Sequence, residues 1–179
     1  MHLHLRRTLP ALSLVLVLSG CTVPAQDTST APARTALADG GHDASLSARG
    51  EYLVRIAGCN DCHTPAYGER AGNVPKAEWL TGSPLGFLGP WGTTYPANLR
   101  LKAADMDEAA WLRYTGNLHT RPLMPDYAVR DMTEDDRRAI YRLLRTLGPA
   151  GQPAPAYRPP GQPPVAPYLQ LVLPPPAQG

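Results

Sequence analysis

The chain has 179 residues, with 17 basic side chains against 15 acidic ones and a net charge of +2. Without Arg6 and Arg7, which belong to the N-terminal segment described next, basic and acidic residues balance at 15 each. Only Lys76 and Lys102 are lysines, and the basic residues form no dense cluster, so the pattern gives no support to nucleic-acid binding.

Residues 1–20 have the pattern of a signal peptide. Arg6 and Arg7 form a short basic region, and the apolar run that follows is too short to span a bilayer. The ending Leu18-Ser19-Gly20-Cys21 resembles the bacterial lipobox, whose cysteine becomes the lipidated first residue of the mature protein. The alternative is ordinary cleavage near Ala25, which would leave Cys21 in the discarded peptide.

The lipobox resemblance implies a lipid anchor on Cys21 and a location on the periplasmic side of a bacterial membrane. Thr22 rather than an aspartate follows the cysteine, which by the same resemblance points to the outer membrane. Residues 21–44 contain few large apolar side chains, so they cannot build a core. We expect them to form a lipid-anchored flexible tether.

Residues 45–148 are about the size of one small domain. The first expected helix runs from about Ser47 to Ala57, because Leu46, Gly50, Leu53 and Ala57 recur at helical spacing. Gly50 has no side chain and would let another helix approach closely.

This helix leads to Cys59-Asn60-Asp61-Cys62-His63, the pattern of a covalent haem c attachment site. Two thiols separated by two residues can add across the two vinyl groups of a porphyrin. The adjacent His63 would then ligate the iron from below. The single occurrence of the motif predicts one haem.

Two other kinds of site could use these cysteines. A zinc site needs a second pair of soft ligands, and the only other cysteine is Cys21. A thioredoxin-like redox pair needs a surrounding βαβ pattern, which the sequence lacks. Haem attachment is therefore the preferred interpretation of Cys59 and Cys62.

Two further helices can be placed after the motif. One begins after Asp107, a good N-cap, and ends at Gly116, with Trp111 and Leu112 as its apolar contacts. The other begins after Thr133, with acidic residues in its first turn and arginines in its last. Its apolar positions share one face, and the helix ends at Gly148-Pro149; they are Ile140, Leu143, Leu144 and Leu147.

A first helix carrying Cys-x-x-Cys-His, a Met-Pro loop and a last amphipathic helix together resemble a bacterial class I cytochrome c over residues 46–148. Residues 50–65 match the opening of that family and residues 133–144 its closing helix. Residues 89–99 are similar to the middle of the cytochrome subunits of membrane-bound alcohol and aldehyde dehydrogenases, which carry three haem domains. The resemblance implies an all-α cytochrome c fold, with helices packed around one covalently attached haem.

The sixth iron ligand decides between an electron carrier and a catalyst. Met106 would pack on Trp111 in a hydrophobic staple, and Met132 directly precedes the Thr133 cap, so both have packing roles. Met124 lies in a loop between two prolines, where the family resemblance places the axial methionine. We expect Met124 to be the ligand, with Met132 and His119 as alternatives.

The resemblance also suggests haem-pocket residues. Trp91, Tyr95, Asn98 and Arg100 lie in the segment that wraps the haem edge in such cytochromes, and all four can donate hydrogen bonds to propionates. An ordinary core or surface role for each is the alternative. The second ring nitrogen of His63 is expected to donate to a backbone carbonyl, near Pro84 or Pro90.

Residues 149–179 are rich in proline and should be mostly extended. We call them the C-terminal strap. The apolar hexad at residues 168–173 is expected to cover part of the domain surface. The alternatives are a disordered tail and a docking site for a partner.

The sequence thus predicts a lipid-anchored, periplasm-facing cytochrome that transfers single electrons between redox proteins and has no catalytic residues of its own. One alternative is an electron-accepting subunit of a periplasmic dehydrogenase or oxidase complex. The other is a haem sensor or small peroxidase with an open sixth position.

Overall fold

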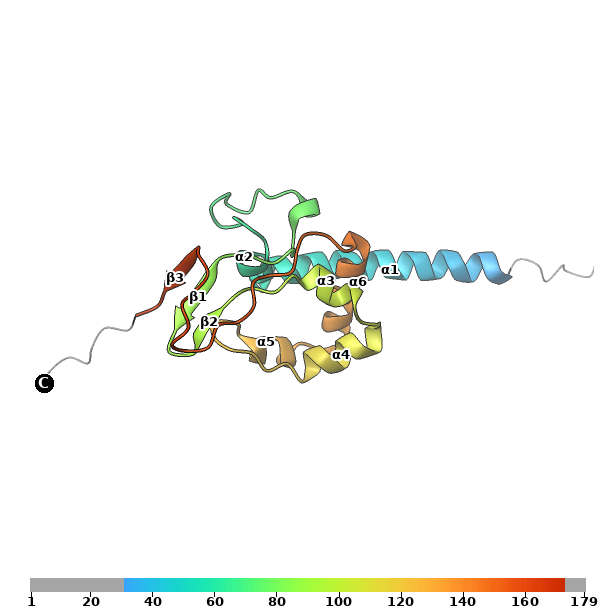
Figure 1. Cartoon of the computed structure of the whole chain (residues 1–179). Coiled ribbons are helices and arrows are strands. Elements are labelled where there is room, and N and C mark those ends of the chain that lie inside the picture. The colour runs from blue at the N-terminus through green and yellow to red at the C-terminus, as the bar shows by residue number, and fades with distance from the viewer. Residues whose placement is uncertain (1–30, 173–179) are drawn as a thin grey trace, which may run out of the picture.

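The computed structural model describes residues 31–172 (Figure 1). The helices and short strands of this part of the chain follow in this order: α1 (Ala31–Ile56), α2 (Cys59–His63), β1 (Gly86–Gly89), β2 (Gly92–Thr94), α3 (Leu99–Ala104), α4 (Glu108–Gly116), α5 (Asp126–Asp131), α6 (Glu134–Leu147) and β3 (Tyr168–Gln170). A 3-10 turn at Lys76–Glu78 lies between α2 and β1. The described part is rich in helix but, unlike the all-α expectation, also contains a small sheet.

The core forms where α1 crosses α6. Gly50 is buried at this crossing, and a Cβ atom placed on it would lie 2.2 Å from the carbonyl oxygen of Ala139. The two helices therefore approach backbone to backbone, as the glycine predicted. Leu53 and Val54 of α1 and Leu143 and Leu144 of α6 are all buried beside the crossing.

The last helix follows its sequence pattern closely. The Thr133 hydroxyl accepts a hydrogen bond from the Asp136 amide at 3.1 Å, which caps the first turn of α6. Gly148 ends the helix with a φ of 70°, and its amide donates to Leu144 at 3.0 Å. The predicted start, end and buried face of this helix are confirmed.

α4 is also confirmed and packs across α6. The Asp107 side chain caps it by accepting from the Ala110 amide at 2.7 Å. Trp111 is buried and donates from its indole to the Arg137 carbonyl at 3.0 Å. The phenol of Tyr141 donates to the Met106 carbonyl at 2.9 Å, which fixes the entry to α4 against α6.

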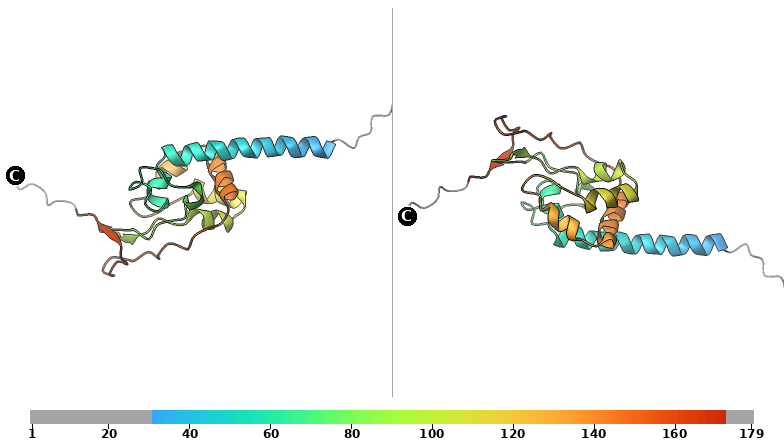
Figure 2. Two further views of the ribbon diagram at one scale, coloured as in Figure 1. Left: turned by 90° about the horizontal axis from the view of Figure 1, so that it is seen from above. Right: turned by 90° about the horizontal axis from the view of Figure 1, so that it is seen from below.

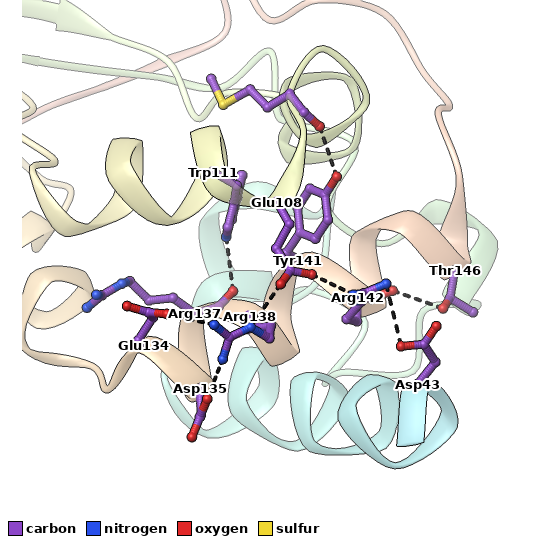
Figure 3. Close-up of polar contacts among 11 residues, drawn as sticks. Asp43, Glu108, Trp111, Glu134, Asp135, Arg137, Arg138, Tyr141, Arg142 and Thr146 are labelled. Carbon is purple, nitrogen blue, oxygen red and sulfur yellow. Dashed lines mark hydrogen bonds and ion pairs between the residues drawn. The ribbon is translucent and has the colours of Figure 1, made fainter. Parts of the chain in front are cut away.

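Ion pairs also join these helices (Figure 3). Glu108 of α4 accepts from Arg138 at 2.9 Å and pairs with Arg142 at 2.7 Å, both on α6. Arg142 also pairs with Asp43 of α1 at 3.5 Å. Glu108 thus links α4 to α6, and Arg142 links α6 to α1.

α1 begins earlier than the sequence suggested. We expected it to start near Ser47, but it starts at Ala31, so residues 31–44 of the predicted tether are helical. Alanine is the strongest helix former and occurs five times in residues 31–44, and Pro32 lies in the first turn, where proline is tolerated. The N-terminal part of α1 extends beyond the other elements (Figure 2). Within residues 31–172, no helix is long and apolar enough to cross a membrane.

The small sheet was not foreseen from the sequence. β1 and β2 form an antiparallel hairpin in which Leu88 lies opposite Thr93 and Gly89 opposite Gly92. β3 pairs in parallel with β1, which gives the order β2-β1-β3. The pairing of β3 with β1 joins segments about 80 residues apart, and no local sequence pattern encodes such a contact.

Residues 149–172 of the C-terminal strap follow an extended path along the outside of the domain to β3 (Figure 2). The described part of the apolar hexad joins the sheet through its backbone. Its side chains do not cover the domain, because Leu169 is 51% exposed and Val172 is 73% exposed. The expected burial of this hexad is therefore wrong for the residues described.

Candidate functional site

The cysteine-histidine motif forms its own short helix, α2, directly after α1. Gly58 joins the two helices with a left-handed φ of 68°, a conformation that glycine adopts without strain. Cys59 opens α2 and His63 closes it, so both thiols and the imidazole project from one helical turn and a half.

Both cysteines of the motif are free thiols. Cys59 is half-buried and Cys62 is exposed. Burial raises the pKa of Cys59 to about 11 and also raises the pKa of Cys62. Both groups are therefore protonated near neutral pH, whereas the reactive cysteine of a thioredoxin-like pair has a lowered pKa.

A zinc site also lacks support around α2. Within residues 31–172, no group of three His, Cys, Asp or Glu side chains could hold a metal ion. Cys21, the third cysteine, lies outside the described residues.

His63 is buried, and one hydrogen bond orients its ring. Its Nδ1 atom donates to the backbone carbonyl of Ala97 at 2.7 Å. Burial lowers the pKa of His63, so the ring is neutral near neutral pH, and the proton on Nδ1 leaves the lone pair of Nε2 available for a metal. A backbone carbonyl was the expected partner, but it belongs to Ala97 rather than to the region of Pro84 or Pro90.

Sequence reasoning missed a buried network behind α2. The Thr64 hydroxyl donates to the Asn60 side-chain oxygen at 2.7 Å and accepts from the Leu80 amide at 2.8 Å. The amide of Gly82 donates to the carbonyl of His63 at 2.8 Å. These contacts fix α2 against residues 80–82. The only sequence signal was a pair of small polar residues four positions apart.

Residues 120–125 form the Met124 loop, which ends at α5. The Thr120 amide donates to the Asp126 carboxylate at 2.6 Å, and the Asp126 amide donates to the Met124 carbonyl at 2.9 Å. The bond from Thr120 is the main cause of the lowered pKa of Asp126, and its contact with Arg130 lowers that pKa further. The carboxylate of Asp126 therefore closes the loop at its base.

The candidate ligands for the sixth position differ in their packing. Met106 and Met132 both pack against the hydrophobic core, as their sequence contexts predicted. Met124 is half-buried and is not among the residues packed on that core. His119 is exposed, and its Nδ1 lies 3.4 Å from the guanidinium of Arg130. Met124 thus lacks the packing role that explains the other two methionines.

A four-residue segment that begins at the end of β2 connects His63 with the Met124 loop. Ala97 accepts from His63, and the Thr94 hydroxyl donates to the Pro122 carbonyl at 2.8 Å. Thr94 and Ala97 are three residues apart, so their Cα atoms lie within about 11 Å of each other. In the view of Figure 1, α2 lies above and α5 below the chain that leads from β2 to α3.

The four suggested pocket residues use their donors on the chain itself. The Trp91 indole donates to Phe87 at 3.3 Å, and the Tyr95 hydroxyl donates to Val165 at 3.0 Å. Asn98 caps α3 and donates to Ala150 and Gln152 of the strap. Their part in holding propionates stays a prediction.

Arg100, the fourth of these residues, is a structural cation. It is only 5% exposed and donates to Ala77 at 2.7 Å, to Gly148 at 2.5 Å and to Leu147. The last two carbonyls belong to the C-terminus of α6, whose dipole favours a positive charge. This geometry accounts for the buried charge without a propionate.

Comparisons with known proteins give one informative match. The chain is 30% identical over 151 residues to the fructose dehydrogenase cytochrome subunit of Gluconobacter japonicus. The match covers 81% of this chain but 29% of that subunit, so the chain spans less than a third of its relative's length. No protein-family model and no solved structure matches. The similarity is consistent with a cytochrome c domain.

Proposed function

We propose that this chain is a c-type cytochrome domain that binds one haem and transfers single electrons. Cys59 and Cys62 would form the two thioether bonds, with His63 and Met124 as the axial ligands. The observation that carries this proposal is the short helix α2, which presents two free thiols beside a neutral imidazole already oriented by Ala97.

The residues around α2 fit a covalently bound porphyrin. Thioether formation would use both thiols, which are free. Two large apolar side chains are exposed: Ile56, close before the motif, by 61%, and Leu123, in the Met124 loop, by 50%. A porphyrin is large and apolar enough to cover such groups.

When bound, the haem supplies one-electron redox chemistry at its iron. The protein's contribution is positional. The carbonyl of Ala97 keeps the His63 ring in one orientation, and the contacts of Thr94 and Asp126 restrain the loop that carries Met124. If His63 and Met124 both bound the iron, oxygen, peroxide and carbon monoxide would have no free position on it.

The match to a dehydrogenase subunit favours a second form of the same function, in which the domain accepts electrons as part of a dehydrogenase complex. We further propose the lipid anchor on Cys21 and a place on the periplasmic side of the outer membrane. These rest on residues 1–22 alone, which lie outside the described residues.

Carbon monoxide binding tests the ligand assignment. The ferrous wild-type protein should bind carbon monoxide slowly or not at all. Met124→Leu, which keeps a similar volume but cannot ligate, should bind it readily and lose the weak thioether–iron absorption of the ferric state. Met132→Leu is the matched control and should behave as wild type, because Met132 packs on the core.

Ready carbon monoxide binding by the wild-type protein, with peroxide turnover, would instead support a sensor or peroxidase. Unchanged spectra in the Met124 variant would refute its role as a ligand. Isolation from native membranes in detergent separates the two electron-transfer forms, since a dehydrogenase should copurify with a complex subunit and not with a free carrier.

A further inference from the structure

The C-terminal strap lies directly on the strand that supports the proposed haem site. Arg158 and Thr93 exchange two backbone hydrogen bonds, of 2.8 and 3.0 Å. Gly92 leaves no space between them, since a Cβ atom there would lie 2.2 Å from the Arg158 carbonyl oxygen. The strap is therefore seated on β2 at a fixed register.

Tyr157 directly precedes Arg158, and its side chain makes two contacts with the domain. Its hydroxyl donates to the Trp91 carbonyl at 2.9 Å, in the turn between β1 and β2. On its ring face, the guanidinium carbon of Arg121 lies 3.6 Å from the ring centroid. This close stack is a cation–π contact between the strap and the Met124 loop.

The Met124 loop depends on such contacts for its shape. It belongs to no helix or strand, and Arg121, Pro122 and Leu123 are all exposed. Apart from its closure at Asp126, the loop is held at neighbouring residues by Thr94, which bonds to Pro122, and by Tyr157, which stacks on Arg121. Met124 follows these two anchors directly.

We propose that the C-terminal strap positions the sixth iron ligand, with Tyr157 as the positioning residue that holds the Met124 loop through Arg121. This inference rests on the proposed ligation by Met124. Exposed segments with few buried contacts open locally at low cost, so loss of the stack would let the loop and its thioether leave the iron more often. The intact strap would thus keep Met124 at the sixth position and limit the access of other ligands to the iron.

The test measures carbon monoxide binding by the ferrous full-length holoprotein, together with the ferric thioether–iron absorption and the melting temperature. Tyr157→Leu and Arg121→Gln should each raise the rate of carbon monoxide binding about 2- to 30-fold, the range expected for loss of a cation–π contact. The double variant should bind carbon monoxide no faster than either single variant, because the two substitutions remove the same contact between Tyr157 and Arg121. Tyr157→Phe keeps the ring and should stay near wild type.

Tyr168→Leu is the matched control, since Tyr168 is a tyrosine of the same strap but is 41% exposed in β3. It should leave the rate unchanged. Equal rates for Tyr157→Leu and wild type, or an equal rise in Tyr168→Leu, would overturn the positioning role. Met124→Leu is measured in the same series: if it opens the iron and Tyr157→Leu does not, only the strap proposal fails. If Met124→Leu changes nothing, the ligand assignment fails and the strap proposal fails with it.

Discussion

Replacement of Gly50 by alanine should strongly destabilise the protein. The added methyl group would lie 2.2 Å from the Ala139 carbonyl oxygen, 2.7 Å from its carbonyl carbon and 2.9 Å from Cβ of Leu143. Two of these atoms are backbone of α6, so they cannot turn aside as a flexible side chain would. The helices must separate, which loosens the packing of the residues beside the crossing.

The size of the effect follows from two opposing terms. Overpacking against a rigid neighbour costs about 3 kcal/mol. Alanine regains about 1 kcal/mol over glycine inside a helix. The net loss is about 2 kcal/mol, which for a domain of this size lowers the melting temperature by about 8–16 °C.

Thermal unfolding of the haem-loaded protein, followed by circular dichroism, measures this shift. Gly41→Ala is the matched control on the same helix, because a Cβ atom there meets nothing within 4 Å. It should leave the melting temperature unchanged or raise it slightly. Equal melting temperatures for the Gly50 and Gly41 variants would refute the close crossing of α1 and α6.

Two further predictions concern buried and half-buried charge. Arg100→Met should lower the free energy of unfolding, measured by denaturant titration, by about 3 kcal/mol, because it leaves three carbonyl acceptors unpaired. The same change at the exposed Arg113 should lower it little. Equal losses for the two variants would contradict the role of Arg100 at the end of α6. Glu108→Gln should lower the free energy of unfolding by about 1 kcal/mol at low salt, because it weakens two ion pairs. This loss of stability should shrink at high salt, where ion pairs are screened. A loss that does not depend on salt would show that the charge of Glu108 is not responsible for it.

The elements that the sequence predicted well are those with local signals. α6 combines a threonine cap, an ordered run of charges and apolar residues at helical spacing, and α4 has an aspartate cap. Each signal acts within one or two turns of helix, so tertiary contacts are not needed to recognise it. Gly50 was recognisable because glycine weakens a helix, so its place on an apolar face indicates that another backbone comes close there.

The elements that escaped prediction depend on contacts between distant segments. β3 is three residues long and exposed, and it is a strand because it pairs with β1. Its own residues carry no signal that predicts this pairing. The same holds for the donors of Asn98 and Arg100, which bond to backbone that only the folded chain brings near. The residue types thus indicate that these side chains can donate hydrogen bonds, but not which backbone carbonyls accept them.

The candidate site shows the same division. The cysteine and histidine positions follow from five consecutive residues, while the carbonyl that orients His63 lies 34 residues away. Met124 was selected by its loop context and by resemblance, and its ligation of the iron stays a prediction.

Covalent haem on α2 is the central claim, and mass analysis of one peptide tests it most directly. Trypsin cleavage after Arg55 and Arg70 releases residues 56–70, which contain Cys59, Cys62 and His63. In protein made in bacteria that mature c-type cytochromes, this peptide should carry the mass of one haem after extraction with acidic organic solvent. Recovery of the peptide with two unmodified thiols, with haem lost to the solvent, would contradict the account.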